Sequence, residues 1–299
     1  AAKYKELGFN RASLGVQDFD EKVQVAINRV QPFEQVQSAV KLLQENGIKA
    51  VNLDMLYGLP LQTKASLEDS LNKLILLEPD RIAYFSYAHV PWVKKHMKLI
   101  EESQLPNAQT KSEFYVFVAD YLAKKGYVPI GIDHFAKPES ELANSLHNKT
   151  LRRNFMGYTN LPNDFIIGIG ASSISGLEQG IAQNCSKMPD YENAIQSGNL
   201  PTSRGWEYSA DDILRKDFIT KFMCYFKVDI AAALSKHGFA SNYLDTELKE
   251  LEKFVSKGII DVQDKKITFT SFYRMLARVV AACFDPYTKL PESKYSKVA

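Results

Sequence analysis

Residues 51–60, VNLDMLYGLP, place a carboxylate where binding sites are commonly found. The run is apolar enough for a buried strand, yet it carries Asp54 and ends in the breaker Gly58-Leu59-Pro60. A carboxylate is costly to bury unless it is paired or binds a ligand. The carboxyl end of a strand in a βα unit is where such ligand sites lie. Asp54 is therefore a candidate acceptor for ligand hydroxyl groups; the alternative is a carboxylate that only caps the turn.

Polar side chains also follow the neighbouring strand signals. Gln17, in LGVQDF, ends the preceding strand and can both donate and accept hydrogen bonds. His89 follows the third strand and Asp133-His134 ends the fourth, so these groups could be metal ligands or an acid–base pair. Lone histidines are also common as structural residues. Polar groups at successive strand ends predict one face of a barrel.

Arginines beside an aromatic ring form another group of candidates. Arg152 and Arg153 precede Phe155 in RRNFMGY, and Arg29 lies in INRVQ. Guanidinium groups are preferred partners of carboxylates, and an aromatic ring can flank a flat ligand; the alternative is a basic surface turn. The loop 168–173, GIGASS, lacks the ending of a phosphate-binding loop. We interpret it as a strand-end loop whose small residues let a ligand lie close to the backbone.

Strand and helix signals alternate in the first half of the chain. We expect strands at 11–16, 48–56, 81–87 and 127–133, and helices at 33–46, 67–77 (candidate cap Ser66) and 108–125. This alternation predicts parallel βαβ architecture, an α/β fold. Residues 165–169 could form a further strand.

A change of composition at 197–209, where Gly, Pro, Ser, Thr and Trp cluster, predicts a boundary between a barrel part at 1–200 and a helical part at 201–299. In the second part we expect helices at 211–234, 247–256 (candidate cap Thr246) and 271–283, and strands at 259–262 and 267–270. This order predicts a winged-helix-like module. Because no dense basic recognition helix is visible, we expect a packing or lid role rather than DNA binding.

The composition is that of an ordinary globular protein. A net charge of +2 indicates neither nucleic acid nor an anionic membrane as the main partner. No apolar run approaches the roughly 18 residues of a membrane span, and no signal peptide is visible, so we expect a cytoplasmic protein. Cys185, Cys224 and Cys283 lie far apart and are expected to be reduced structural thiols.

Together these segments resemble the oxygen-independent coproporphyrinogen III oxidase family of radical S-adenosylmethionine (SAM) enzymes. The resembling segments run in register over nearly the whole chain: GFNRASLGVQDF (8–19), INRVQ (27–31), VNLDMLYGLPLQT (51–63), YAHVP (87–91), GIDHFAKP (131–138), RRNFMGYT (152–159), GIGASSIS (168–175), AQN (182–184), LRKDFITKFMCYFKVD (214–229) and FDPY (284–287).

The resemblance implies a (β/α)6 partial barrel followed by a mainly helical C-terminal domain. It also implies a [4Fe-4S] cluster, two bound SAM molecules, and oxidative decarboxylation of two propionates of coproporphyrinogen III to vinyl groups. An unidentified electron donor or acceptor and a monomeric state are expected. By motif, the positions that correspond to SAM contacts are Gln17, Arg29, Asp54, Ala88 and Ile174, with Phe155 as a neighbour of the same site. We assign Arg152 and Arg153 to substrate propionates from charge complementarity alone.

The chain departs from the family in one respect. The family carries a C-x3-C-x2-C motif that holds the cluster, and this sequence contains none, so we expect a fragment that is inactive on its own. It begins without Met and meets a strand signal almost at once, which also favours a piece of a longer protein. Two alternatives stay open. One is a non-catalytic haem- or tetrapyrrole-binding homologue; the other is a metal-dependent lyase or hydrolase using His89, His134, Asp54 and Asp133.

Overall fold

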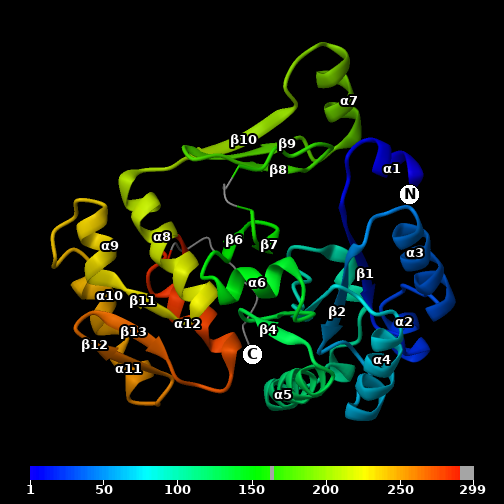
Figure 1. The fold of residues 1–299 in the computed structure, drawn as a ribbon, viewed down its shortest axis with the longest axis horizontal. Coiled ribbons are helices and arrows are strands. Elements are labelled where there is room, and N and C mark those ends of the chain that lie inside the picture. Colours follow the sequence, from blue (N-terminus) through cyan, green and yellow to red (C-terminus); the bar gives the residue numbers. More distant parts are fainter. Residues whose placement is uncertain (162–164, 290–299) are drawn as a thin grey trace. The chain divides into compact units, whose positions relative to one another are not determined.

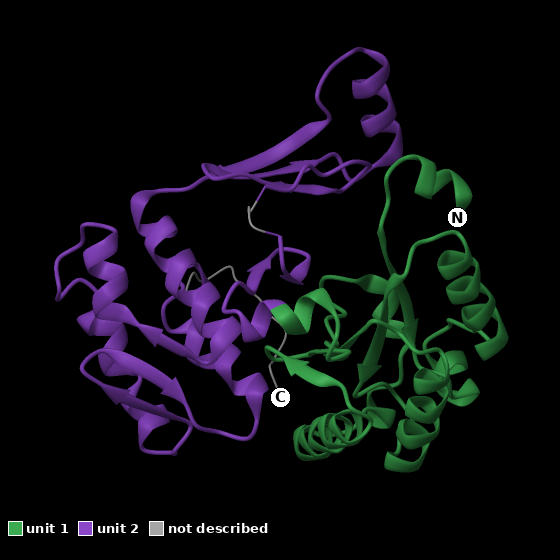
Figure 2. Ribbon diagram, viewed as in Figure 1, with its two compact units in different colours: residues 1–144, 290–299 green, residues 145–289 purple. Residues whose placement is uncertain are grey.

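The computed structural model describes residues 1–161 and 165–289. The chain divides into two compact units, residues 1–144 with 290–299 and residues 145–289 (Figure 2). Each unit is described by itself below. Among the described residues, none of the helices is long and apolar enough to span a membrane.

The first unit is an α/β layer. Its elements are α1 (Ala2–Glu6), β1 (Arg11–Gln17), α2 (Glu21–Ala26), α3 (Phe33–Glu45), β2 (Ala50–Tyr57), α4 (Lys64–Leu76), β3 (Arg81–Ser86), the 3-10 turns η1 (Lys95–Leu99) and η2 (Glu102–Gln104), α5 (Ala108–Lys124), β4 (Val128–Ile130) and β5 (His134–Ala136), with α6 (Glu141–His147) crossing into the second unit. The sheet order is β1-β2-β3-β5-β4, and β1, β2 and β3 are parallel.

Side-chain alternation along β2 separates a core face from a polar face. Val51, Leu53, Met55 and Tyr57 are buried, while the residues between them are half-buried. Helices α3 and α5 pack against β2, and Figure 1 shows α3, α4 and α5 on one side of the strands. The opposite face of β1 and β2 carries polar residues, because successive side chains of a strand point to opposite sides. Within the described residues the sheet does not close, since β1 and β4 are its edges.

The predicted elements 11–16, 33–46, 48–56, 81–87 and 108–125 are confirmed within one to two residues at most ends. The fourth predicted strand, 127–133, is wrong, because only residues 128–130 of this segment form a strand, β4. The chain turns at Gly131, whose φ is 55°, so that β4 and β5 form an antiparallel pair, and β5 runs antiparallel to β3. Asp133 and His134 therefore lie at the turn and the start of β5 rather than at the end of one long strand.

The start of α4 also differs from the prediction. Thr63 is the N-cap and accepts a hydrogen bond from the Ser66 backbone N–H, while the Ser66 hydroxyl accepts one from the Thr63 N–H. Ser66 is thus the second member of a capping box and not the cap itself.

The second unit combines short antiparallel sheets with helices. Its elements are β6 (Arg152–Asn154), β7 (Gly157–Thr159), β8 (Ile174–Gly176), β9 (Gly180–Asn184), α7 (Met188–Gln196), β10 (Thr202–Glu207), α8 (Ala210–Tyr225), β11 (Lys227–Asp229), α9 (Ile230–Lys236), α10 (Asp245–Glu250), α11 (Glu252–Val255), β12 (Ile260–Gln263), β13 (Lys266–Phe269), η3 (Arg274–Leu276), α12 (Ala277–Ala282) and η4 (Pro286–Lys289). The sheets are β6-β7, β10-β9-β8 and β11-β13-β12.

The predicted two-stranded wing is confirmed as β12 and β13, joined by a turn in which Asp264 and Lys265 have φ of 48° and 61°. The predicted helix 211–234 is wrong because Phe226 adopts a left-handed φ of 58° and ends α8. The chain then pairs with β13 as β11, and the Asp229 side chain caps α9. The predicted helix 247–256 is divided into α10 and α11, and its expected cap Thr246 lies inside α10. The predicted helix 271–283 begins later, because residues 271–273 precede η3 and α12.

One further expectation on the second unit is corrected. Residues 165–169 form no strand; only Ile166 makes an isolated bridge, with Gly176. The segment 197–209, where we expect a boundary, contains β10, which pairs with β9. The domain boundary expected at residue 200 stays a prediction, and the compact units divide at Ser145 instead.

Candidate functional site

Asp54 lies in a polar cluster on the open face of β1 and β2. Its Oδ2 accepts a hydrogen bond from the Ser13 hydroxyl at 3.1 Å, and its Oδ1 accepts one from the Asn52 amide at 2.6 Å. Asn52 Nδ2 also donates to the Ser13 hydroxyl at 2.8 Å. The Asn52 Oδ1 atom is buried and has no hydrogen-bond partner within the described residues. A carboxylate has about four acceptor sites, so half-buried Asp54 retains capacity for a ligand.

Gln17 and Arg29 meet beside this cluster, over Gly15. The register pairs Gly15 with Asp54 and shifts between Gly15 and Gln17, whose φ is 74°. Arg29 Nη2 donates to the Gly15 carbonyl at 2.6 Å, and Arg29 Nε donates to Gln31 Oε1 at 2.8 Å. A Cβ atom at Gly15 would lie 2.8 Å from Gln17 Nε2 and 3.2 Å from Arg29 Nη2. The missing side chain therefore leaves room for these two polar groups.

Three residues predicted separately from the sequence, Gln17, Arg29 and Asp54, are thus brought together at one edge of β1 and β2. The cluster offers a carboxylate and an amide oxygen that can accept hydrogen bonds, and a guanidinium and an amide that can donate them. This combination suits a ligand with both hydroxyl and carboxylate groups. Its donors and acceptors fit SAM, which carries ribose hydroxyls and an amino-acid carboxylate, and the unpaired buried acceptor Asn52 Oδ1 belongs to the residue that hydrogen-bonds to Asp54.

Asp18, the residue after Gln17, anchors the end of β1 in the core and was missed by sequence reasoning. It is fully buried, and it accepts hydrogen bonds from Gln62 Nε2, the Ser70 hydroxyl and the Asp20 N–H at 2.5, 2.6 and 2.8 Å. Burial raises the pKa of the Asp18 carboxyl, and these hydrogen bonds oppose the rise. The available signal was a second carboxylate directly after the strand, but its side-chain partners lie 44 and 52 residues away.

A buried glutamine links Asp18 to the loop that carries Arg29. Gln24 Nε2 donates to the carbonyls of Asp18 and Gln31 at 2.8 Å each, and Gln24 Oε1 accepts from the Gln31 N–H at 3.0 Å. Gln31 in turn accepts from Arg29. The position of the Arg29 guanidinium is therefore set by hydrogen bonds that begin in the core.

The two candidate histidines already have partners. His89 Nδ1 lies 3.1 Å from the Tyr87 hydroxyl, and His89 Nε2 lies 3.2 Å from Glu102. His134 Nδ1 lies 2.7 Å from Asp133, and its ring contacts Phe85. Ala88, between Tyr87 and His89, is half-buried just after β3.

No group of three or more His, Cys, Asp or Glu side chains that could hold a metal ion is present among the described residues. The three cysteines are free thiols; Cys224 and Cys283 are buried and Cys185 is half-buried. Burial raises the pKa of the Cys224 thiol to about 12, with a smaller opposing effect of Arg153. The described residues therefore do not fit an iron–sulfur cluster, nor the metal centre of a lyase or hydrolase.

In the second unit, the two candidate arginines are consecutive residues of β6, so their side chains point to opposite sides of the strand. Arg152 is exposed and borders a hollow, whereas the Arg153 guanidinium lies over the Tyr158 ring at 5.6 Å. Arg153 Nε is buried without a hydrogen-bond partner in the described part of the chain. Phe155 is exposed at the tip of the β6–β7 hairpin. Arg152 is thus the more exposed of the two arginines.

The loop before β8 folds tightly on itself. Asn184 Nδ2 donates to the carbonyls of Gly168 and Gly170 at 3.2 and 3.0 Å. A Cβ atom at Gly168 would lie 2.9 Å from the backbone carbon of Ile174, the half-buried SAM-contact candidate. The packing of the chain against Ile174 explains this glycine without an approaching ligand.

Comparison with known proteins adds three findings. The radical SAM superfamily profile matches residues 1–74. The chain is 40% identical over 280 residues to an oxygen-independent coproporphyrinogen III oxidase of Bradyrhizobium diazoefficiens, covering 94% of this chain and 62% of the relative. It is 42% identical over 292 residues to a Helicobacter pylori protein of the same name, covering 97% and 64%.

The fold agrees with a solved structure. The coproporphyrinogen III oxidase of Escherichia coli, described as a radical SAM enzyme, superposes with a TM-score of 0.87 at 34% identity, covering 96% of this chain and 66% of that one. This confirms the predicted fold class. The chain spans a little under two thirds of the length of the curated relatives it matches. The resemblance predicted from the sequence is therefore confirmed, and the chain is homologous over nearly its whole length to oxygen-independent coproporphyrinogen III oxidases of the radical SAM superfamily.

Proposed function

We propose that this chain forms the SAM-binding and substrate-binding part of an oxygen-independent coproporphyrinogen III oxidase. The proposed reaction converts two propionates of coproporphyrinogen III to vinyl groups with loss of carbon dioxide, giving protoporphyrinogen IX. The observation that carries the proposal is that Gln17 and Arg29 meet over Gly15, the register partner of Asp54, in a chain with these relatives.

The residues of the first unit are proposed to orient SAM. Asp54 would accept hydrogen bonds from hydroxyl groups, and Arg29 would bind a carboxylate. When bound, SAM would supply hydrogen-abstraction chemistry toward the propionate, once an external electron donor had cleaved it reductively. In the first unit, Ala88 is also proposed to contribute its backbone. In the second unit, the resemblance assigns Ile174 to a SAM contact and Phe155 to a neighbouring position. The resemblance implies two SAM molecules.

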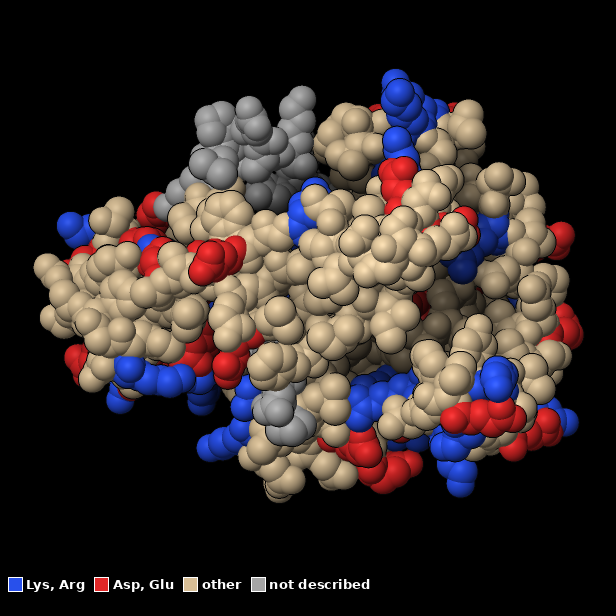
Figure 3. Space-filling model, turned by 90° about the horizontal axis from the view of Figure 1, so that it is seen from above, with Lys and Arg blue, Asp and Glu red and all other residues tan. Residues whose placement is uncertain are grey.

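Substrate propionates are proposed to bind arginine in the second unit. The exposure of Arg152 makes it the more accessible partner, while Arg153 supports the strand through Tyr158. The resemblance also implies a [4Fe-4S] cluster, but the described residues supply no fitting ligand set, so no step is assigned to it. The electron acceptor is unidentified, and a cytoplasmic monomer without nucleic-acid or membrane partners belongs to the proposal. On the face in Figure 3, basic and acidic side chains are interspersed, which is compatible with this partner assignment.

Calorimetric titration of the chain with SAM tests the cofactor site. We expect Asp54→Asn to weaken SAM affinity about tenfold or more, because the amide presents a donor where the carboxylate accepts. Asp120→Asn, on the exposed surface of α5, is the matched control and should bind SAM like the parent chain. Equal affinity of Asp54→Asn and the parent would remove Asp54 from the site.

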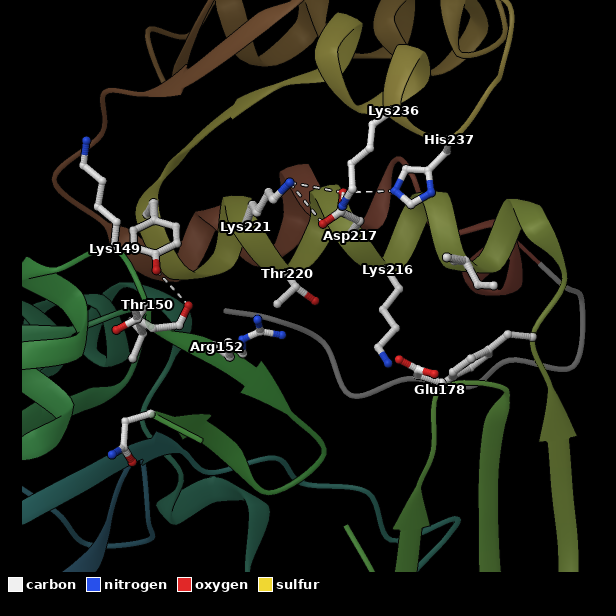
Figure 4. Close-up of a pocket in the computed structure, with 15 residues that line it drawn as sticks. Lys149, Thr150, Arg152, Glu178, Lys216, Asp217, Thr220, Lys221, Lys236 and His237 are labelled. Atoms are coloured by element: carbon white, nitrogen blue, oxygen red, sulfur yellow. Dashed lines mark hydrogen bonds and ion pairs between the residues drawn. The ribbon is translucent and has the colours of Figure 1, made fainter. Parts of the chain in front are cut away.

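A non-catalytic tetrapyrrole-binding protein is the second candidate function. The observation that favours it is the cationic hollow beside Arg152 (Figure 4), which could hold a carboxylated macrocycle without any SAM chemistry. Tetrapyrrole binding by a chain that shows no SAM affinity would support this alternative over the oxidase.

A further inference from the structure

Gln24, a glutamine of α2 that is only 3% exposed, holds the loop that carries Arg29 through two separate sets of contacts. The first set is made by its backbone, whose carbonyl accepts the Arg29 N–H at 2.8 Å. Asn28, with a left-handed φ of 54°, donates its own N–H to the Val25 carbonyl at 3.0 Å. These two bonds form a Schellman motif, which ends α2 and sets the direction in which the chain leaves the helix.

The side chain of Gln24 fixes the far end of the same loop. Its Nε2 donates to the Gln31 carbonyl at 2.8 Å and its Oε1 accepts from the Gln31 N–H at 3.0 Å, so one amide pairs with both polar backbone groups of one residue. Nε2 also donates to the Asp18 carbonyl at 2.8 Å, directly after β1. A carboxylate of the same shape could not replace this amide, because it has no donor for the two carbonyls.

The Arg29 guanidinium is held in turn at two points, and both lie on one edge of its plane. Nε donates to Gln31 Oε1 at 2.8 Å, and Nη2 donates to the Gly15 carbonyl at 2.6 Å. The other end, formed by Nη1 and the second Nη2 proton, has no hydrogen-bond partner within the described residues. Arg29 is exposed, and a guanidinium binds a carboxylate through two parallel N–H bonds. This end is therefore available to a ligand carboxylate.

The place of this guanidinium relates it to the proposed SAM site. It lies over Gly15, the register partner of Asp54. SAM carries ribose hydroxyls at one part of the molecule and an amino-acid carboxylate at another, so the carboxylate contact depends on where the loop 28–31 places Arg29. An arginine side chain has many rotamers, and ordering it before the ligand arrives lowers the entropic cost of binding.

We propose that Gln24 is a positioning residue that sets the selectivity of this site for nucleosides bearing an amino-acid carboxylate. Gln24 is buried and touches no ligand itself. It fixes the loop 28–31, the loop orders Arg29 through Gln31, and Arg29 binds the carboxylate. The inference rests on the proposed function, because SAM is the carboxylated nucleoside assigned to the site. Loss of Gln24 then costs the carboxylate contact and spares the contacts to the nucleoside.

Calorimetric titration of the whole chain with SAM and with decarboxylated SAM tests the proposal. Decarboxylated SAM keeps the nucleoside, the sulfonium and the amine, and lacks only the carboxylate. We expect Gln24→Leu to weaken SAM binding about fivefold or more, because hydrogen bonds between charged groups contribute strongly. Binding of decarboxylated SAM should change less than about twofold, since its contacts do not pass through Arg29. A merely structural effect would weaken both ligands equally and would overturn the proposal.

A double variant and a matched control isolate the connection between Gln24 and Arg29. Arg29→Gln should abolish the preference for SAM, and Gln24→Leu/Arg29→Gln should lose no more of it, because both residues act on one contact. Additive losses would overturn the proposal. Gln62→Leu is the control: Gln62 is also buried and donates to Asp18 and to the Leu56 carbonyl, but it does not contact the loop 28–31. It should keep the parent's ratio of the two affinities.

Nuclear magnetic resonance of the Arg29 side chain gives a readout that needs no ligand. In the ¹⁵N-labelled chain, the heteronuclear NOE of Arg29 Nε–H should report an ordered group in the parent and in Gln62→Leu, and a mobile one in Gln24→Leu. Gln31→Ala removes the acceptor of Arg29 Nε and leaves the buried Gln24 in place. It should show the same mobility and the same loss of SAM preference, so the proposal stays testable even where Gln24→Leu does not fold.

The outcomes keep the positioning role and the proposed function apart. A parent chain that binds SAM, with a preference that survives Gln24→Leu and Gln31→Ala, would overturn the role of Gln24 and leave the function intact. A parent chain that binds SAM and decarboxylated SAM equally would also overturn only the positioning role. A parent chain that binds neither would overturn the function, and the selectivity assigned to Gln24 with it.

Discussion

Gly15 shows how the absence of a side chain can define a site. Its carbonyl accepts from Arg29, and the space above it is occupied by the ends of Gln17 and Arg29. Asp54 lies in register on the next strand. The placement of the candidate SAM-binding side chains therefore depends on a residue that has no side-chain functional group of its own.

We predict that Gly15→Ala impairs SAM binding and leaves stability nearly unchanged. The new methyl group would displace Gln17 Nε2 and Arg29 Nη2, both at the ends of flexible side chains. The free energy of unfolding should change by less than about 1 kcal/mol, while SAM affinity falls several-fold in calorimetric titration. A large loss of stability with unchanged affinity of the folded chain would contradict this account of Gly15.

Asp18 allows a prediction about pH at the residue scale. Burial raises the pKa of Asp18 in the folded chain above its unfolded value, so its contribution to stability is largest below the unfolded pKa and is lost as pH rises through the folded pKa. We expect Asp18→Asn to lower the free energy of unfolding by about 1–3 kcal/mol, because the amide cannot accept from all three donors.

The difference between the parent chain and Asp18→Asn should shrink as pH increases from 4 to 7, since only the parent carries this titrating group. Urea unfolding at both pH values measures it. A difference that widens with pH would show that the hydrogen bonds, rather than burial, dominate the Asp18 pKa.

At the scale of elements, local sequence patterns predicted much of the first unit. Strands β1 to β3 and helices α3 and α5 follow apolar periodicity within each segment. The break at Phe226 could not be predicted, because a bulky residue rarely adopts a left-handed φ. There, pairing of β11 with β13 and ring contact with Phe269 outweigh the helical preference of the sequence.

The candidate site was predicted in part for the same reason. Gln17, Arg29 and Asp54 could be identified from motif and position, but Asp18, Gln24 and the Ser13–Asn52 pair could not. Their roles depend on contacts between segments distant in sequence, for example between Ser13 and Asn52 on neighbouring strands. Local patterns carry no information on such pairings.

The cap of α4 gives a prediction at the element scale. Thr63 accepts from the Ser66 N–H and begins the helix, while Ser66 accepts from the Thr63 N–H. We expect Thr63→Ala to lower the free energy of unfolding by about 1 kcal/mol and Ser66→Ala to lower it less. Thermal or urea unfolding of both variants measures this. A larger effect of Ser66→Ala would restore Ser66 as the principal cap.

At the scale of the whole molecule, the main question is which parts of the chain unfold together as cooperative units. Composition predicts a boundary at residue 200, yet hydrogen bonds within the second unit cross that position. β10 pairs with β9, the Tyr158 hydroxyl donates to the Met223 carbonyl at 3.1 Å, and the Tyr225 hydroxyl donates to the Leu151 carbonyl at 2.8 Å. These contacts tie residues 145–200 to residues 201–289.

We therefore predict that native-state hydrogen exchange divides the chain near Ser145. Amides of β6, β7 and α8 should open with one shared free energy as denaturant is added, because breaking α8 away would remove the partners of both tyrosines. Amides of β1, β2 and β3 should form a separate group. Tyr158→Phe deletes one hydroxyl bond and should lower the opening free energy of the first group by about 1 kcal/mol without changing the second. If β6 and β7 exchanged together with β1 to β3 instead, the boundary at residue 200 would describe the cooperative units better.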